Sequence, residues 1–159
     1  MAFKVQTERE LAFIVIFESL FRGDEDPKEL FDLILEGADP DGIYSNVLSG
    51  IRDGDLDYAR AALAGVIAND EKIRGIITSH ARGWKYDRIS RVSLAVLKLA
   101  IWEILFSDAV HPGTAINEAV ELAKIYDDDK APAFVNGILG SVVREDLPGG
   151  SDASSDEKQ

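Results

Sequence analysis

Apolar residues recur along most of this chain at spacings of about three and four positions, the period of an α-helix. No segment shows the alternation of apolar and polar residues that marks a half-buried β-strand. The most apolar stretch runs from Ser90 to Phe106, with its polar residues confined to a narrow strip, and predicts a central core helix. The uninterrupted apolar run from Leu11 to Phe17 predicts another helix that is buried on most sides. The pattern therefore predicts an all-α fold.

Capping residues and prolines indicate where the other helices begin. Thr7 and Glu10 form a capping box, so the first helix is expected to start at Glu8 and to reach about Phe21. Asp26 and Pro27 begin a second helix, which ends at a glycine. Further helices are expected over residues 43–51, 55–67 and from about 70 onward. With the core helix and a C-terminal pair, these are eight candidate segments, of which six or seven are expected to form the helices of one domain.

The composition is that of a single globular domain. The chain has 159 residues, of which 46% are apolar, which suffices for one hydrophobic core. It contains no apolar run of the about 18 residues that a membrane span needs, and no secretory leader is recognisable. It has no cysteine, so disulfides and thiolate metal sites are excluded and a cytoplasmic location is expected.

Charge is distributed unevenly along the chain. The net charge of −12 argues against a generally basic, nucleic-acid-binding surface. Residues 145–159 hold five acids and one base, so an acidic, disordered tail is expected over 146–159 after a helical domain spanning 1–145. Between Lys72 and Lys98, by contrast, seven bases accompany one acid, with Trp84 and Tyr86 among them. This basic segment has the composition of an RNA-binding face.

Catalytic and metal-binding patterns are missing from the sequence. The two histidines, His80 and His111, have no cysteine and no Ser-His-Asp arrangement to work with, and no phosphate-binding glycine loop occurs. The run from Asp127 to Asp129 lacks the spacing, the glycine and the distal glutamate of a calcium loop, which favours a solvated turn between helices. We therefore expect neither an enzyme nor a cofactor or metal site.

The segment from Thr114 to Gly137 predicts two consecutive helices. Thr114 is expected to cap the first of them, and Pro132 suits the first turn of the second. The motif INEAVELAK (residues 116–124) followed by FVNG (residues 134–137) resembles the C-terminal signature of the NusB family of transcription antitermination factors. The resemblance extends over about residues 8–143. It implies two packed helical bundles.

The resemblance also implies a function. Family members bind boxA-type RNA together with the small ribosomal protein NusE, and the pair joins the RNA polymerase antitermination complex at ribosomal RNA operons. Tyr126 and Phe134 stand at the family's aromatic positions beside the loop, where they are expected to stack on bases, and Lys130 is expected to reach a phosphate. At the N-terminus the family's arginine run is thinned to Arg9, with Lys4 nearby, so weak, salt-dependent binding to RNA alone is expected.

The middle helices are the expected partner surface, with Arg88, Arg91, Lys98 and Trp102 as contacts. For Trp102 the sequence leaves a second interpretation open, an aromatic ring partly buried under lysine stems. Two other functions remain open as well. One is a helical protein-interaction module with weakened RNA binding, acting through the ribosomal partner or as a homodimer. The other is the RNA-recognition domain type shared with some ribosomal RNA methyltransferases, which the missing catalytic domain disfavours.

Overall fold

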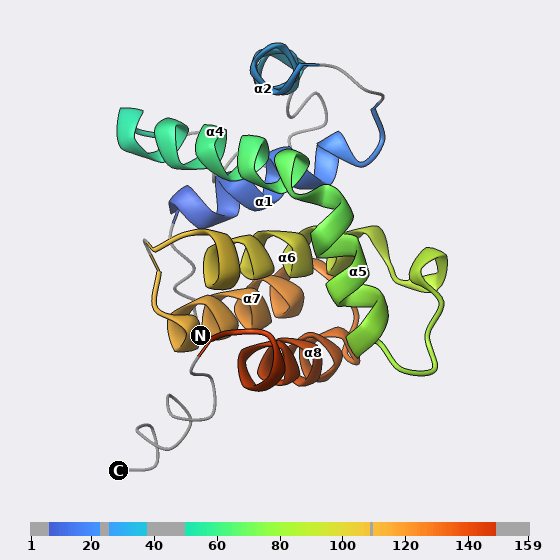
Figure 1. The fold of residues 1–159 in the computed structure, drawn as a ribbon. Helices are drawn as coiled ribbons and strands as arrows, with labels where there is room; N and C mark the ends of the chain where they lie inside the picture. The colour runs from blue at the N-terminus through green and yellow to red at the C-terminus, as the bar shows by residue number, and fades with distance from the viewer. Residues whose placement is uncertain (1–6, 23–25, 38–49, 109, 149–159) are drawn as a thin grey trace.

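The computed structural model describes residues 7–22, 26–37, 50–108 and 110–148. This part of the chain contains helices and no strands, which confirms the all-α prediction. The α-helices are α1 (Thr7–Ser19), α2 (Pro27–Gly37), α4 (Asp53–Ala68), α5 (Asp70–His80), α6 (Arg91–Ile101), α7 (Pro112–Tyr126) and α8 (Ala131–Glu145) (Figure 1). A 3-10 turn, η1 (Tyr86–Arg88), precedes α6, and a π-helical segment, η2 (Trp102–Phe106), continues it.

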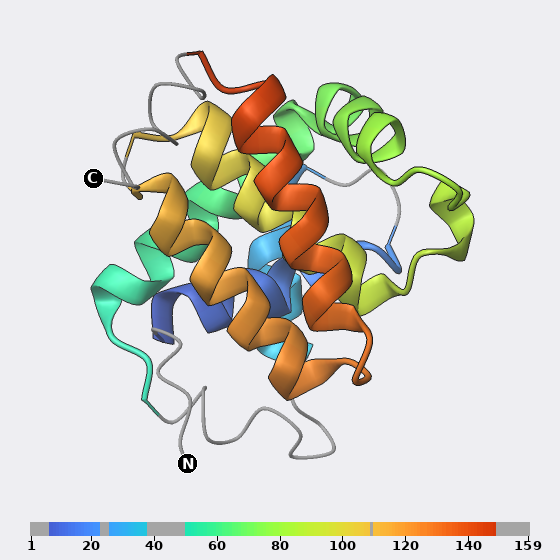
Figure 2. The same cartoon turned by 90° about the horizontal axis from the view of Figure 1, so that it is seen from below.

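The helices form two groups that meet along α1. Helices α1, α2 and α4 make one group, and α5, α6, α7 and α8 make the other (Figure 1). Helix α1 packs against α4 on one side and α6 on the other, while α7 and α8 lie side by side (Figure 2). This arrangement agrees with the expected pair of packed bundles.

The two most apolar sequence segments form the centre of the core. Every residue from Leu11 to Ile16 is at most 1% exposed, so the middle of α1 is buried, which confirms the prediction of a helix buried on most sides. The stretch from Ser93 to Ile104 is also buried throughout. Because burial of apolar surface is the main favourable contribution to folding, these two segments stabilise the contact between the groups.

Several helix ends differ from the sequence-based expectations. Helix α1 begins at Thr7 and α4 at Asp53, one and two residues earlier than expected. The assignment of Thr114 as the cap of α7 is wrong: the helix begins at Pro112, and the ring nitrogen Nδ1 of His111 accepts the backbone N–H of Gly113 at 3.0 Å. A proline at the first position needs no N–H partner, so the helix starts there.

A close approach between α4 and η2 fixes the position of Trp102. A Cβ atom on Gly65 would lie 1.9 Å from Nε1 of Trp102, so only glycine leaves room for the indole. Tyr58, about two turns before Gly65 in α4, meets the same indole edge-on at 6.0 Å between ring centroids. The α4–η2 contact therefore depends on the absence of a side chain at residue 65.

Some expectations fall outside the described residues. The helix expected over 43–51 lies almost wholly there, and so do Lys4 and residues 149–159 of the expected tail. The boundary between domain and tail at residues 145 and 146 therefore stays a prediction. Among the helices described, none is long and apolar enough to cross a membrane.

Candidate functional site

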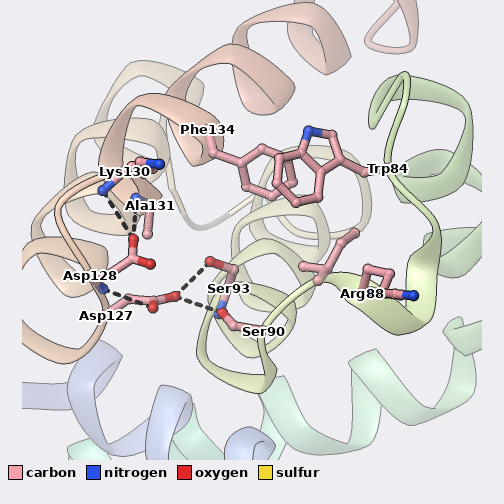
Figure 3. A pocket seen from close by; sticks show the side chains of 10 residues that line it. Trp84, Arg88, Ser90, Ser93, Asp127, Asp128, Lys130, Ala131 and Phe134 are labelled. Carbon is pink, nitrogen blue, oxygen red and sulfur yellow. Dashed lines mark hydrogen bonds between the residues drawn. The ribbon is translucent and has the colours of Figure 1, made fainter.

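The loop between α7 and α8 is held by its own aspartates. Oδ2 of Asp127 accepts hydrogen bonds from the hydroxyls of Ser90 and Ser93, both at 2.7 Å, which ties the loop to the start of α6. Oδ1 of Asp128 accepts the backbone N–H groups of Lys130 and Ala131, both at 3.0 Å, at the start of α8 (Figure 3). Carboxylates at helix N-termini satisfy N–H groups that have no partner inside the helix. The acidic loop is thus rigidly placed between two helix starts.

This arrangement gives two of the three loop aspartates structural roles. In the part of the chain that the structure describes, no group of three His, Cys, Asp or Glu side chains is placed to hold a metal ion.

Tyr126 joins the end of α7 to α1. Its hydroxyl donates to Oε2 of Glu10 at 3.1 Å, and its ring lies 4.9 Å from that of Phe13. Burial raises the pKa of Glu10, and the hydrogen bond from Tyr126 partly offsets that rise. The ring of Tyr126 is therefore half-buried against α1 at the point where the loop begins, and part of the ring surface is exposed.

Phe134 meets a residue of the basic segment, which the sequence did not pair with it. Its ring lies 5.4 Å from that of Trp84, with the planes 61° apart in an edge-to-face contact. Trp84 is 56% exposed, an unusual state for so large an apolar side chain. Gly83 precedes it with φ of 80°, a backbone conformation that favours glycine, and the N–H of Trp84 closes the turn on the carbonyl of Ala81.

Between these elements lies a pocket of about 250 Å³, called the loop pocket below. It is lined by residues from the segment between α5 and α6, which includes η1, and from α6, the α7–α8 loop and α8, namely Trp84, Arg88, Ile89, Ser90, Ser93, Asp127, Asp128, Lys130, Ala131 and Phe134. Figure 3 shows Trp84 and Arg88 on one side, and the two aspartates with Lys130 on the other. The aromatic loop position, the loop cation and the basic segment thus share one surface.

Arg9 lies away from that surface, inside the protein. Its side chain is 5% exposed, and Nε donates to Oε2 of Glu103 at 3.1 Å. The hydroxyl of Tyr58 donates to the same oxygen. Burial raises the pKa of Glu103, and the hydrogen bonds from Tyr58 and Arg9 oppose that rise. Glu118 faces the same buried site, where burial raises its pKa too. This network joins α1, α4 and η2.

The four expected partner residues divide into two kinds. Arg88 and Arg91 are exposed, and the guanidinium of Arg91 lies 5.9 Å from the ring of Phe21. Lys98 is buried, with Nζ 2.7 Å from Oδ1 of Asp70, and Trp102 is 9% exposed against Gly65. The buried interpretation of Trp102 therefore describes its surroundings better than a surface position does. Only the two arginines present their side chains to an approaching molecule.

Three comparisons relate the chain to known proteins. The model of the NusB family matches residues 6–144. "Transcription antitermination protein NusB" of Clostridium botulinum is 33% identical over 137 residues, which are 85% of this chain and 96% of that protein. The protein of the same name from Ruminiclostridium cellulolyticum is 37% identical over 134 residues, which are 83% and 92% of the two chains.

Solved structures show the same likeness. NusB of T. maritima superposes with a TM-score of 0.75 at 29% identity, covering 96% of this chain and 99% of that one. A crystal structure of the antitermination factors NusB and NusE in complex with dsRNA superposes with a TM-score of 0.69 at 29% identity, covering 86% and 92%.

Proposed function

Since the chain belongs to the NusB family, we propose that it is a non-enzymatic RNA-binding adaptor in transcription antitermination. It binds boxA-type RNA together with the ribosomal protein NusE, and the assembly acts on RNA polymerase at ribosomal RNA operons, in the cytoplasm. The observation that carries this proposal is the shared surface of the α7–α8 loop and the basic segment. There, Phe134 and Lys130 lie around one pocket with Trp84 and Arg88.

The proposed RNA contacts are those expected from the sequence: Lys4, Arg9, Tyr126, Lys130 and Phe134. The rigid placement of the loop supports Tyr126, Lys130 and Phe134, because an ordered site loses little conformational entropy on binding. A contact from Arg9 requires its guanidinium to leave Glu103. We therefore place the main affinity at the loop, which fits a chain with a net charge of −12.

The two histidines have positions that support a non-enzymatic role. Nδ1 of His111 caps α7. The ring of His80 bridges α5 to the end of α8, with Nδ1 3.0 Å from the hydroxyl of Ser141 and Nε2 against the carboxylate of Asp146. Both imidazoles thus hold helices in place.

For the protein partner we propose a surface centred on Arg88 and Arg91, with Lys98 and Trp102 shaping it from beneath. Both arginines are exposed: Arg88 lies in η1 and lines the loop pocket, and Arg91 is the first residue of α6. This places the partner beside the RNA, so that each stabilises the other's binding. A homodimer through the same helices is the alternative, in which the chain works as an interaction module with weakened RNA binding. We propose further that residues 1–145 form the working domain and that residues 146–159 are its tail, the first residue of which, Asp146, is tied to the domain through His80.

An RNA titration with and without NusE tests this function. A labelled boxA-type oligoribonucleotide is titrated with the protein alone, with NusE alone and with both, at two salt concentrations. We expect weak, strongly salt-dependent binding by the protein alone and much tighter binding by the pair, because the partner adds positive surface. If the pair binds the RNA no better than NusE alone, the adaptor function is wrong and the interaction module is favoured.

A further inference from the structure

The loop pocket has the size of a site for a single ring system. Its volume of about 250 Å³ lies below the range of about 300–1,000 Å³ that is typical of pockets for drug-sized ligands. One planar group entering from an extended chain would fill it. The pocket opens on the surface where we propose that RNA lies. Bound RNA would therefore supply a ring system of this size, an unpaired nucleobase.

The aromatic wall of the pocket offers one open ring face. Trp84 and Phe134 meet edge-to-face, with the ring planes 61° apart, so the two rings do not form parallel walls around a base. Phe134 instead fixes the orientation of the indole. Trp84 remains 56% exposed, which leaves a ring face for stacking. Bases stack well on such faces because every base has a π-surface.

The opposite wall carries a hydrogen-bond acceptor. Asp127 already accepts hydrogen bonds from Ser90, Ser93 and the backbone N–H of Asp128. Asp128 receives both of its backbone donors on Oδ1, and its Oδ2 is the atom that we assign to the ligand. An ionised carboxylate accepts hydrogen bonds and donates none. It therefore favours a base with an exocyclic amino group and disfavours uracil, whose one N–H lies between two carbonyl oxygens.

Two cations complete the site. Arg88 and Lys130 are both exposed and lie on opposite sides of the pocket (Figure 3). A nucleotide whose base enters the pocket leaves its two flanking phosphates outside, one on each side. Arg88 and Lys130 are placed to bind one phosphate each.

We propose that the loop pocket holds one unpaired base of the bound RNA that carries an exocyclic amino group (cytosine, adenine or guanine), stacked on Trp84, with its amino group at Asp128 and its flanking phosphates at Arg88 and Lys130. The proposal rests on the proposed function, since RNA must reach the α7–α8 loop. It adds Trp84 and Asp128 to the residues that contact RNA, and it gives Arg88 to the RNA, which leaves Arg91 as the exposed arginine for the protein partner. It also gives the protein a preference against uracil at one position.

The first test is a titration of the protein–NusE pair with a boxA-type oligoribonucleotide. Trp84→Ala should weaken binding by about 5- to 150-fold, the loss of one stacked base. Trp84→Phe, which keeps a ring, should bind nearly as well as the parent. Tryptophan fluorescence, which in the parent includes the exposed Trp84, should be quenched by RNA in the parent and much less in Trp84→Phe. Leu33→Ala, at another exposed apolar residue 44% exposed and outside the pocket, is the matched control and should bind like the parent.

The second test exchanges the acceptor for a donor. In Asp128→Asn the remaining carbonyl still caps α8, because asparagine caps helices as well as aspartate does. Its amide group now donates toward the base. With oligoribonucleotides in which each cytosine, adenine or guanine is replaced in turn by uracil, one replacement should weaken binding by the parent at least about fivefold. Asp128→Asn should lose or reverse that preference while its melting temperature stays near that of the parent.

The outcomes separate this inference from the function on which it rests. If the parent pair binds no RNA, the proposed function is wrong and the pocket assignment falls with it. If the parent pair binds RNA while Trp84→Ala and Asp128→Asn bind it equally well with the same base preference, only the pocket assignment is wrong. If Trp84→Ala weakens binding to NusE in the absence of RNA by as much as it weakens RNA binding, the pocket receives a protein side chain and the nucleobase is refuted.

Discussion

Replacing Arg9 by alanine separates a structural role from a role in RNA binding. Arg9 and Glu103 are 5% and 1% exposed, and the ion pair between them has an Nε–Oε2 distance of 3.1 Å. Removing one partner of a buried pair leaves the other charge uncompensated, at a cost of about 3–5 kcal/mol. Because small domains are stable by only about 5–15 kcal/mol, Arg9→Ala should lose a large share of the free energy of unfolding.

The pH dependence of that loss follows from Glu103. Burial raises its pKa in the folded protein, so between the ordinary glutamate pKa and this raised pKa the folded state binds more protons than the unfolded state. The contribution of Glu103 to the free energy of unfolding is therefore present at low pH. It is lost as the pH rises from the ordinary glutamate pKa to the raised pKa. Without Arg9 the pKa of Glu103 rises further, which extends the interval upward. The destabilisation by Arg9→Ala should thus be larger near pH 8 than near pH 5.

Urea unfolding measured by circular dichroism gives the required free energies. A double-mutant cycle with Glu103→Ala isolates the interaction, and we expect a coupling of about 0.5–3 kcal/mol. Arg9→Lys, which keeps the charge but loses the planar donor geometry, should fall between parent and alanine variant. An Arg9→Ala variant with the parent's urea midpoint and a large loss of RNA affinity would refute the structural role and show that Arg9 acts through its contact with RNA.

Three further changes test other parts of the structure. Gly65→Ala should lower stability by about 1–3 kcal/mol in thermal unfolding, since a Cβ would lie 1.9 Å from Trp102; an unchanged melting temperature would contradict the close approach. Asp127→Ala should lower the free energy of unfolding by about 1–3 kcal/mol, because the hydroxyls of Ser90 and Ser93 lose a charged acceptor. A smaller effect in urea unfolding would show that the loop does not depend on these two hydrogen bonds. Lys130→Ala should reduce the slope of log affinity against log salt concentration by about one counterion, while Tyr126→Phe should leave that slope unchanged. Equal slopes for the parent and Lys130→Ala would show that Lys130 does not contact a phosphate.

The core was predictable because its signals are local. The apolar run from Leu11 to Phe17 and the stretch from Ser90 to Phe106 each contain too few polar residues for a surface helix, and most of each is buried. Helix starts were less predictable, because competing signals lie close together. Thr114 is a good capping residue, yet Pro112 two positions earlier already has the backbone conformation of a first helical turn, and His111 supplies the acceptor.

The state of Arg9 was not predictable from its neighbours in the sequence. Its partner, Glu103, lies 94 residues away and is brought there by the packing of α1 against α6 and η2. An arginine near the N-terminus of an RNA-binding family member is expected at the surface, and nothing local indicates otherwise. The burial of Trp102 has a similar cause, since the space for its indole comes from Gly65 on another helix.

The two regions that form the candidate site were predictable from the sequence, but their contact was not. The sequence indicated the loop residues by resemblance and the basic segment by composition, as two separate regions. The structure joins them through the contact between Trp84 and Phe134, across 50 positions of the chain. The signal available in the sequence was an aromatic residue, Trp84, in a basic segment without an apolar pattern around it. An aromatic outside any helical stripe is a candidate for contact with a ligand.

Cross-linking of the assembled complex shows which residues of this chain lie against the RNA. A boxA-type oligoribonucleotide carrying photoreactive bases is bound to the protein–NusE pair, irradiated, and mapped to peptides by mass spectrometry. Our account predicts cross-links in two peptides of this chain, around residues 82–91 and 126–134, with the tryptophan at position 84 among the modified residues. Cross-links confined to α2 and α4, with none in those two peptides, would contradict it.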